Sequence, residues 1–118
     1  MSAPTPDFAM GYRAMMLDGL AREVETTKKV LAAIPDGKRD YRPDPHARTA
    51  WELAWHLANT DVQFMDGIAD LKFSMVARAE AEKPKTVAEL VDWYDRNMKR
   101  CADRVGTVAN AGRFYGYL

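Results

Sequence analysis

The stretch that decides the fold is Thr49-Ala50-Trp51-Glu52-Leu53-Ala54-Trp55-His56-Leu57-Ala58-Asn59-Thr60-Asp61. It opens with Thr-x-x-Glu, in which the Thr49 hydroxyl can accept from the backbone N–H of Glu52 while the Glu52 carboxylate accepts from the N–H of Thr49. This capping box predicts the start of a helix that runs to about residue 68. A row of apolar residues at helical spacing is expected to face the core; the row is Leu53, Leu57, Phe64 and Ile68.

His56 is the candidate ligand on this predicted helix. It lies about 100° from Leu57, so we expect its ring at the interior edge of the apolar face. A lone histidine in such a place is more often packed or capped than a ligand, and both interpretations stay open here. Glu52 can orient the ring as an acceptor or be used by the cap, which is favoured. His46 is interpreted as an exposed loop histidine, with a role as second ligand left open.

Length and composition indicate one domain over residues 1-118. The 17 basic and 17 acidic residues balance, which argues against nucleic acid or an anionic membrane as partner. No apolar run approaches the ~18 residues of a membrane span. The single cysteine, Cys101, excludes an intrachain disulfide and fits a reducing compartment; it lies on an apolar row and is expected to be buried. Since no signal peptide opens the sequence, a cytoplasmic location is expected.

Two further helices flank the first. Apolar spacing predicts one over about 5–34, which ends because Pro35 cannot continue the hydrogen-bond ladder. Thr86-Val87-Ala88-Glu89 is a second capping box and predicts a helix over about 86–108. Its inner face is expected to hold Leu90, Tyr94, Asn97, Met98, Cys101, Val105 and Val108. Asp61 and Asp66 are interpreted as solvated. Because nothing indicates a strand, the predicted fold class is all-α.

The apolar faces of these helices are unusually wide. Adjacent apolar pairs such as Met15-Met16 and Val30-Leu31 broaden them, and long helices in such proteins usually close in fours. Left open, three such helices would expose a continuous apolar strip, which monomers rarely tolerate. We therefore expect the chain to form a homodimer, or to bind a second polypeptide segment that supplies a fourth helix. Of the two, the homodimer is favoured for the chain as given.

The order of these features resembles the DinB-like family, also described as DinB/YfiT-like metalloenzymes. The resemblance covers nearly the whole chain, from the long first helix and the Pro-rich loop after it to the helix that opens at Thr86. Its strongest part is Trp55-His56-Leu57-Ala58 within the stretch from Arg48, followed by Phe64-Met65-Asp66-Gly67-Ile68-Ala69. The resemblance implies an up-down bundle of four helices that is commonly dimeric.

The resemblance also implies a divalent transition metal, zinc or nickel, held by three histidines. One of these lies on the second helix of the family, and a His-x-x-x-His pair lies on the fourth. Only His56 has a counterpart here, since no histidine follows Val108. Arg113-Phe114-Tyr115-Gly116 resembles the stretch before the fourth helix, so the resemblance implies that this helix is not encoded. The metal site in this chain would then be incomplete, because zinc usually takes three or four protein ligands.

Two functions of different classes follow as expectations. The first, by resemblance, is a metal-dependent enzyme of the hydrolase or thiol-transferase class, acting on a small molecule through a Lewis-acid ion or an activated water or thiol. The second is a non-catalytic helical assembly module completed by a partner chain. The sequence identifies no catalytic residue, since it contains no phosphate-binding glycine loop and no recognisable nucleophile motif. A transition metal bound at His56 would support the enzyme, whereas a metal-free interface lined by Leu, Phe and Met would support the assembly module.

Overall fold

The computed structural model describes residues 6–73 and 82–106, which form three long helices. Helix α1 spans Pro6–Ala32, α2 spans Ala50–Asp70 and α3 spans Val87–Gly106. A single turn of 3-10 helix, η1, lies at Asp36–Lys38. The four helix bounds that can be compared lie within two residues of the predicted ones, whereas the predicted start at residue 5 and the predicted end at residue 108 lie outside the described residues. The described residues contain no strand, so the all-α class is confirmed.

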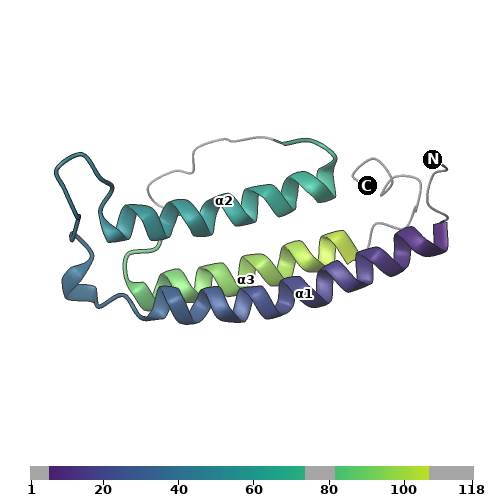
Figure 1. Cartoon of the computed structure of the whole chain (residues 1–118), viewed down its shortest axis with the longest axis horizontal. Helices are drawn as coiled ribbons and strands as arrows, with labels where there is room; N and C mark the ends of the chain where they lie inside the picture. Colours follow the sequence, from purple (N-terminus) through teal and green to yellow (C-terminus); the bar gives the residue numbers. More distant parts are fainter. Residues whose placement is uncertain (1–5, 74–81, 107–118) are drawn as a thin grey trace.

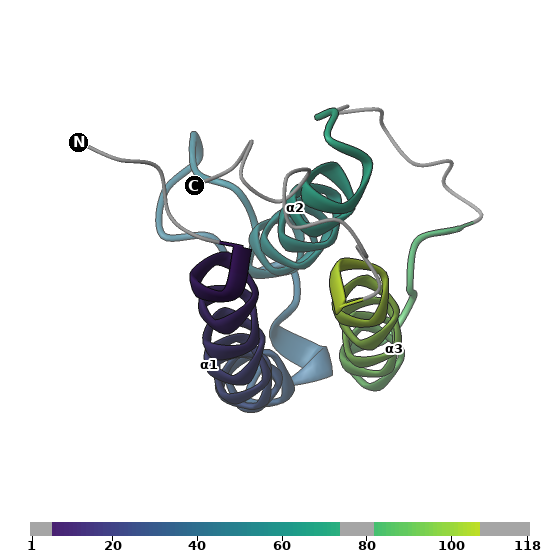
Figure 2. The same ribbon diagram turned by 90° about the vertical axis from the view of Figure 1, so that its right-hand side faces the viewer.

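Helix α3 is the shared neighbour of the other two. It packs along both α1 and α2, whereas α1 and α2 scarcely contact each other. Figure 1 shows α1 and α3 running side by side beneath α2, and the end-on view in Figure 2 places the three helices at the corners of a triangle. None of the described helices combines the length and the apolar composition that a membrane span requires.

Both predicted helix starts are present. At α2 the Thr49 hydroxyl accepts from the N–H of Glu52 at 3.1 Å and the Glu52 carboxylate accepts from the N–H of Thr49 at 3.3 Å, so the capping box is complete. At α3 the Thr86 hydroxyl accepts from the N–H of Glu89 at 3.1 Å. The Glu89 carboxylate accepts from the N–H of Lys85 at 2.8 Å, one residue before the predicted partner.

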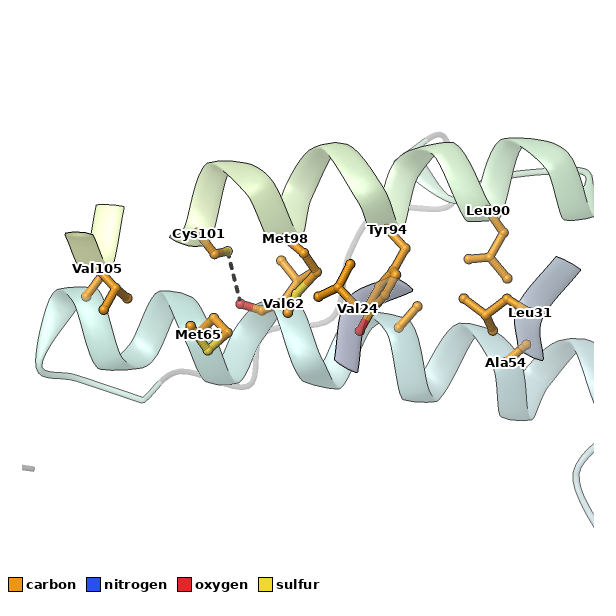
Figure 3. Close-up of a cluster of buried hydrophobic side chains, with 12 residues drawn as sticks. Val24, Leu31, Ala54, Val62, Met65, Leu90, Tyr94, Met98, Cys101 and Val105 are labelled. Carbon is orange, nitrogen blue, oxygen red and sulfur yellow. Dashed lines mark hydrogen bonds between the residues drawn. The ribbon is translucent and has the colours of Figure 1, made fainter. Parts of the chain in front are cut away.

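The core runs along the inner face of α3, as its spacing predicts (Figure 3). The buried residues of α3 are Val87, Leu90, Tyr94, Met98, Cys101 and Val105. Those of α2 include Ala54, Ala58, Val62, Met65 and Ala69, and α1 adds Val24 and Leu31. Asn97 is half-buried and donates to the carbonyl of Trp93 at 2.9 Å. The predicted Val108 lies outside the described residues.

The row predicted for the core on α2 is largely wrong. Leu53, Leu57 and Phe64 are 55%, 42% and 55% exposed, and only Ile68 packs against the core. The reason is that α2 meets α3 through Ala54, Ala58 and Val62, a face turned about 100° from the leucine row. Small alanines let the two helices approach closely, so the larger side chains are left on the neighbouring side.

His56 is likewise exposed and does not lie at an interior edge. Side chains two residues apart on a helix point about 200° away from each other around the helix axis. His56 therefore points away from Ala54 and Ala58, the buried residues on either side of it. His46 is exposed in the loop before α2, as predicted.

Helix α2 ends in a turn that brings an aromatic ring back onto it. Leu71 adopts the left-handed conformation, with φ of 56°, and its N–H bonds to the carbonyls of Gly67 and Ile68. Phe73 then lies directly over Gly67, with its ring centre 5.5 Å from that of Phe64. A Cβ at position 67 would overlap the Phe73 ring, so glycine is what permits this contact.

Candidate functional site

A groove of about 780 Å³ lies between α1 and α2 and reaches down to α3. Its walls are mostly apolar. From α1 they include Phe8, Tyr12, Met16, Leu17 and Leu20; from α2, Phe64, Met65 and Ile68; from α3, Tyr94, Met98 and Val105. We call this the α1–α2 groove. It exists because α3 separates the two helices while they scarcely contact each other.

Polar side chains from all three helices meet at the floor of the groove. The hydroxyl of Tyr94, on α3, donates to the Asp61 carboxylate of α2 at 2.8 Å, and Glu23 and Thr27 of α1 line the same groove. Burial, followed by the hydrogen bond to Asp61 and its charge, raises the pKa of Tyr94 well above its usual value, although a hydrogen bond with Thr27 acts in the opposite direction. Tyr94 therefore stays a neutral phenol and serves as a donor.

Two carboxylates line this part of the groove and make it negative: Asp61 is half-buried, whereas Glu23 is exposed on α1. Neither Asp61 nor Glu23 forms an ion pair with a cation in residues 6–73 or 82–106. Among the described residues, Arg13 is the cation that lines the groove. It precedes Glu23 by ten residues on α1, which places it about 15 Å away along the helix axis. The floor can thus attract a positive group from outside the described part of the chain.

A second charged cluster ties α2 to α3 outside the groove. The Asp66 carboxylate accepts from Arg100 at 2.9 and 3.0 Å and from Arg104 at 2.5 Å, and Arg104 also pairs with Asp70. The hydrogen bonds from Arg100, with help from Arg104, lower the pKa of Asp66 to about 2. Because its members satisfy one another, this cluster is structural.

Cys101 borders the same cluster. Its thiol lies 3.4 Å from the Asp66 carboxylate. It also lies 3.7 Å from the carbonyl of Val62 (Figure 3). Burial, followed by the charge of Asp66, raises the pKa of Cys101 to about 11. A thiol is nucleophilic only when ionised, so Cys101 is the buried, inert residue that the sequence predicts.

The model of the DinB superfamily matches residues 20–114 of the chain. The chain belongs to the DinB superfamily. The match begins within α1 and runs through α2 and α3, so it confirms both the resemblance and the helical-bundle class. No curated protein and no solved structure gives a significant match to the chain.

The described side chains of this DinB-superfamily chain do not form a metal centre. Within residues 6–73 and 82–106, no three His, Cys, Asp or Glu side chains come together in a way that could hold an ion. His56 and His46 are both exposed, and the structure does not bring them into one ligand group. Since zinc sites take three or four protein ligands, the donor set of the described residues is too small to hold zinc.

The residues at the groove floor were only partly predictable. Asp61 was expected to be solvated, whereas it is half-buried and bonded to Tyr94. One sequence signal pointed to such a pair: Tyr94 lies on the inner face of α3, and a buried tyrosine hydroxyl usually finds a partner. The position of Tyr94 in the sequence could not show which side chain, or which helix, would supply that partner.

Proposed function

We propose that this DinB-superfamily chain is a helical assembly module whose α1–α2 groove receives a helix from another polypeptide. The observation that supports it is the exposed apolar row of α2, formed by Leu53, Leu57 and Phe64. Met15 and Met16 of α1 are exposed as well. Monomers rarely expose contiguous apolar patches beyond a few hundred Å², so a surface of this kind favours an interface.

The dimensions favour a helix as the occupant. From Leu53 to Ile68 the row extends over about 22 Å of α2, at 1.5 Å per residue. Amphipathic helices bind such surfaces through anchors at i, i+3 or i+4 and i+7. A helix seated between α1 and α2 would bury the row and close the arrangement as four helices, the usual solution for long amphipathic helices.

A homodimer and a separate polypeptide remain two routes to this closure. In a homodimer the same surface of each copy would contact the other about a two-fold axis. In the second route a different chain would supply the helix. Location is a related proposal: the lone, buried Cys101 suits the reducing conditions of the cytoplasm.

The second candidate function is a metal-dependent enzyme, of the hydrolase or thiol-transferase class, formed only in the completed assembly. The observation that favours it is the position of His56. Its ring is exposed about 60° around α2 from Leu53, so a helix lying on the apolar row would pass beside it. The remaining ligands for zinc or nickel would then have to come from the added helix.

Charge placed in the apolar row tests the assembly. We expect light scattering to show that Leu57→Glu and Phe64→Glu weaken self-association of the purified chain at least tenfold. Val30→Glu is the matched control, because Val30 is also exposed on its helix but does not line the groove. Equal weakening by all three variants, or none by any, would contradict an interface at this row.

Elemental analysis of the purified assembly tests the enzyme. Stoichiometric zinc or nickel that disappears in His56→Ala would support the second candidate. An assembly that forms normally but contains no transition metal, even after incubation with zinc, would refute the metal-dependent enzyme. The assembly module would then remain as the proposed function.

A further inference from the structure

The floor of the groove carries negative charge in an apolar setting. Asp61 is half-buried at the floor, and Glu23 lines the opposite wall as an exposed residue of α1. No cation within the described residues pairs with either of them. Water exclusion by an incoming helix would strengthen the field of both carboxylates, and an uncompensated buried charge is strongly unfavourable. Whatever fills the groove must therefore bring a positive group or be excluded.

The geometry of Asp61 prepares it to receive such a group. Tyr94 donates to one carboxylate oxygen at 2.8 Å and thereby fixes the side chain, which reduces the entropy lost on binding. An ionised carboxylate offers about four acceptor positions, so one bond from Tyr94 leaves several for a ligand. A lysine or arginine side chain supplies the matching donors, and its aliphatic stem suits the apolar walls.

The apolar surface is longer than a small amine could cover. Leu53 and Leu57 are exposed on α2 beyond the residues that line the groove, and Met15 is exposed on α1. A small molecule bound at Asp61 would leave these side chains in water. A helix lying along α2 would cover them and present one side chain to the floor.

Electrostatics make a second copy of this chain a weaker occupant of the groove than a helix that carries a positive group, so the dimer of the purified chain should give way to such a helix. In an isologous dimer each groove faces its symmetry mate. Such an arrangement would bring the Asp61 and Glu23 pairs of two copies toward one another, and juxtaposed like charges disfavour an interface. A helix from a different polypeptide carries no such constraint.

We infer that the α1–α2 groove selects a helix from a different polypeptide that carries a lysine or arginine within its apolar face, placed to meet Asp61 and Glu23. This inference rests on the proposed assembly function and adds the chemistry of the partner. The apolar row provides contact area, and the two carboxylates provide selectivity.

Three synthetic 18-residue peptides test it. They share a leucine face and an alanine–glutamine face, and differ only at the central position of the leucine face, which is Lys, Met or Glu. Binding of the labelled peptides to the full chain is measured by fluorescence anisotropy. We expect the Lys peptide to bind at least tenfold more tightly than the Met peptide, and the Glu peptide to bind most weakly.

Charge-neutral variants locate the selectivity. In Asp61→Asn/Glu23→Gln the preference for Lys over Met should fall to less than twofold, with the affinity for the Met peptide unchanged. Asparagine can still accept from Tyr94, so the fold is kept, and thermal melts check this. Asp103→Asn, on the exposed side of α3, is the matched control and should keep the full preference.

The possible failures are distinguishable. Equal binding of all three peptides would overturn the inference and leave the assembly function standing. Persistence of a dimer of the chain at saturating Lys peptide would overturn it in favour of a second copy. If no peptide binds more tightly than a scrambled peptide of the same composition, the groove does not accept helices, and the proposed function itself fails.

Discussion

At the scale of single residues, Asp66 is the carboxylate that most strongly links α2 to α3. It accepts a bidentate pair from Arg100 and a further bond from Arg104, and its pKa falls from 3.8 to about 2. A carboxylate whose pKa is lower in the folded state stabilises the fold at any pH above its pKa in the unfolded chain. That stabilisation is lost as the pH falls to the pKa of the folded state. The relevant window is therefore pH 4 to 2.

We expect Asp66→Asn to lower the free energy of unfolding at pH 7 by roughly 1–2 kcal/mol, after allowance for solvent screening of this partly exposed group. The difference from the unsubstituted chain should shrink steadily between pH 4 and pH 2. Urea denaturation followed by circular dichroism over a pH series measures it. Asp92→Asn, which removes an exposed i,i+4 pair with Arg96, should have little effect. A difference that does not vary with pH would contradict the role given to this charge.

Leu90 and Leu57 separate the core from the apolar row. Leu90 is fully buried and Leu57 is 42% exposed, so we expect Leu90→Ala to lower stability by roughly 2–5 kcal/mol at any protein concentration. Leu57→Ala should lower it only where the chain is associated, and the loss should shrink on dilution because association stabilises by mass action. Thermal melts at several concentrations measure both. A large, concentration-independent loss for Leu57→Ala would show that the row is buried within one chain.

At the scale of elements, the end of α2 depends on a close contact between Gly67 and Phe73. Alanine is favoured over glycine inside a helix by about 1 kcal/mol, yet a Cβ at position 67 overlaps the Phe73 ring. We therefore expect Gly67→Ala to give no gain in the natural chain, and to stabilise by about 1 kcal/mol when Phe73→Ala is also present. A double-mutant cycle from urea denaturation measures this coupling. Additive effects would show that Phe73 does not pack on Gly67.

The elements themselves were largely predictable because their signals are local. The Thr49 capping box and the spacing of Leu90, Tyr94 and Met98 depend on neighbours within one helix, and both predictions are confirmed. Periodicity could not tell which side of α2 would meet α3, because the leucine row and the alanine face are only about 100° apart. The periodicity favoured the larger side chains as the buried ones, whereas close packing of α2 on α3 buries Ala54 and Ala58.

The candidate site was harder to predict because it is tertiary. Asp61, Tyr94 and Glu23 belong to three different helices and meet only through their packing. His56 showed the opposite problem: its type suggested a ligand, but its position on α2 turns it away from the buried face. Residue type suggested chemistry, and helix packing decided where that chemistry lies.

At the scale of the whole molecule, the three helices leave the α1–α2 groove open and the row of Leu53, Leu57 and Phe64 exposed. We hold that association with another polypeptide buries these surfaces. An open, three-helix monomer would expose an apolar strip along two helices, and association is the usual way to remove such a strip from water.

Light scattering combined with thermal melting, over a dilution series of the purified chain, tests this most directly. We expect a molar mass above the 13.3 kDa of one chain at micromolar concentration, with a melting temperature that falls on dilution because the folded state is coupled to association. A cooperatively melting monomer of 13.3 kDa, with a melting temperature independent of concentration, would contradict it, because the three helices would then be stable without another polypeptide.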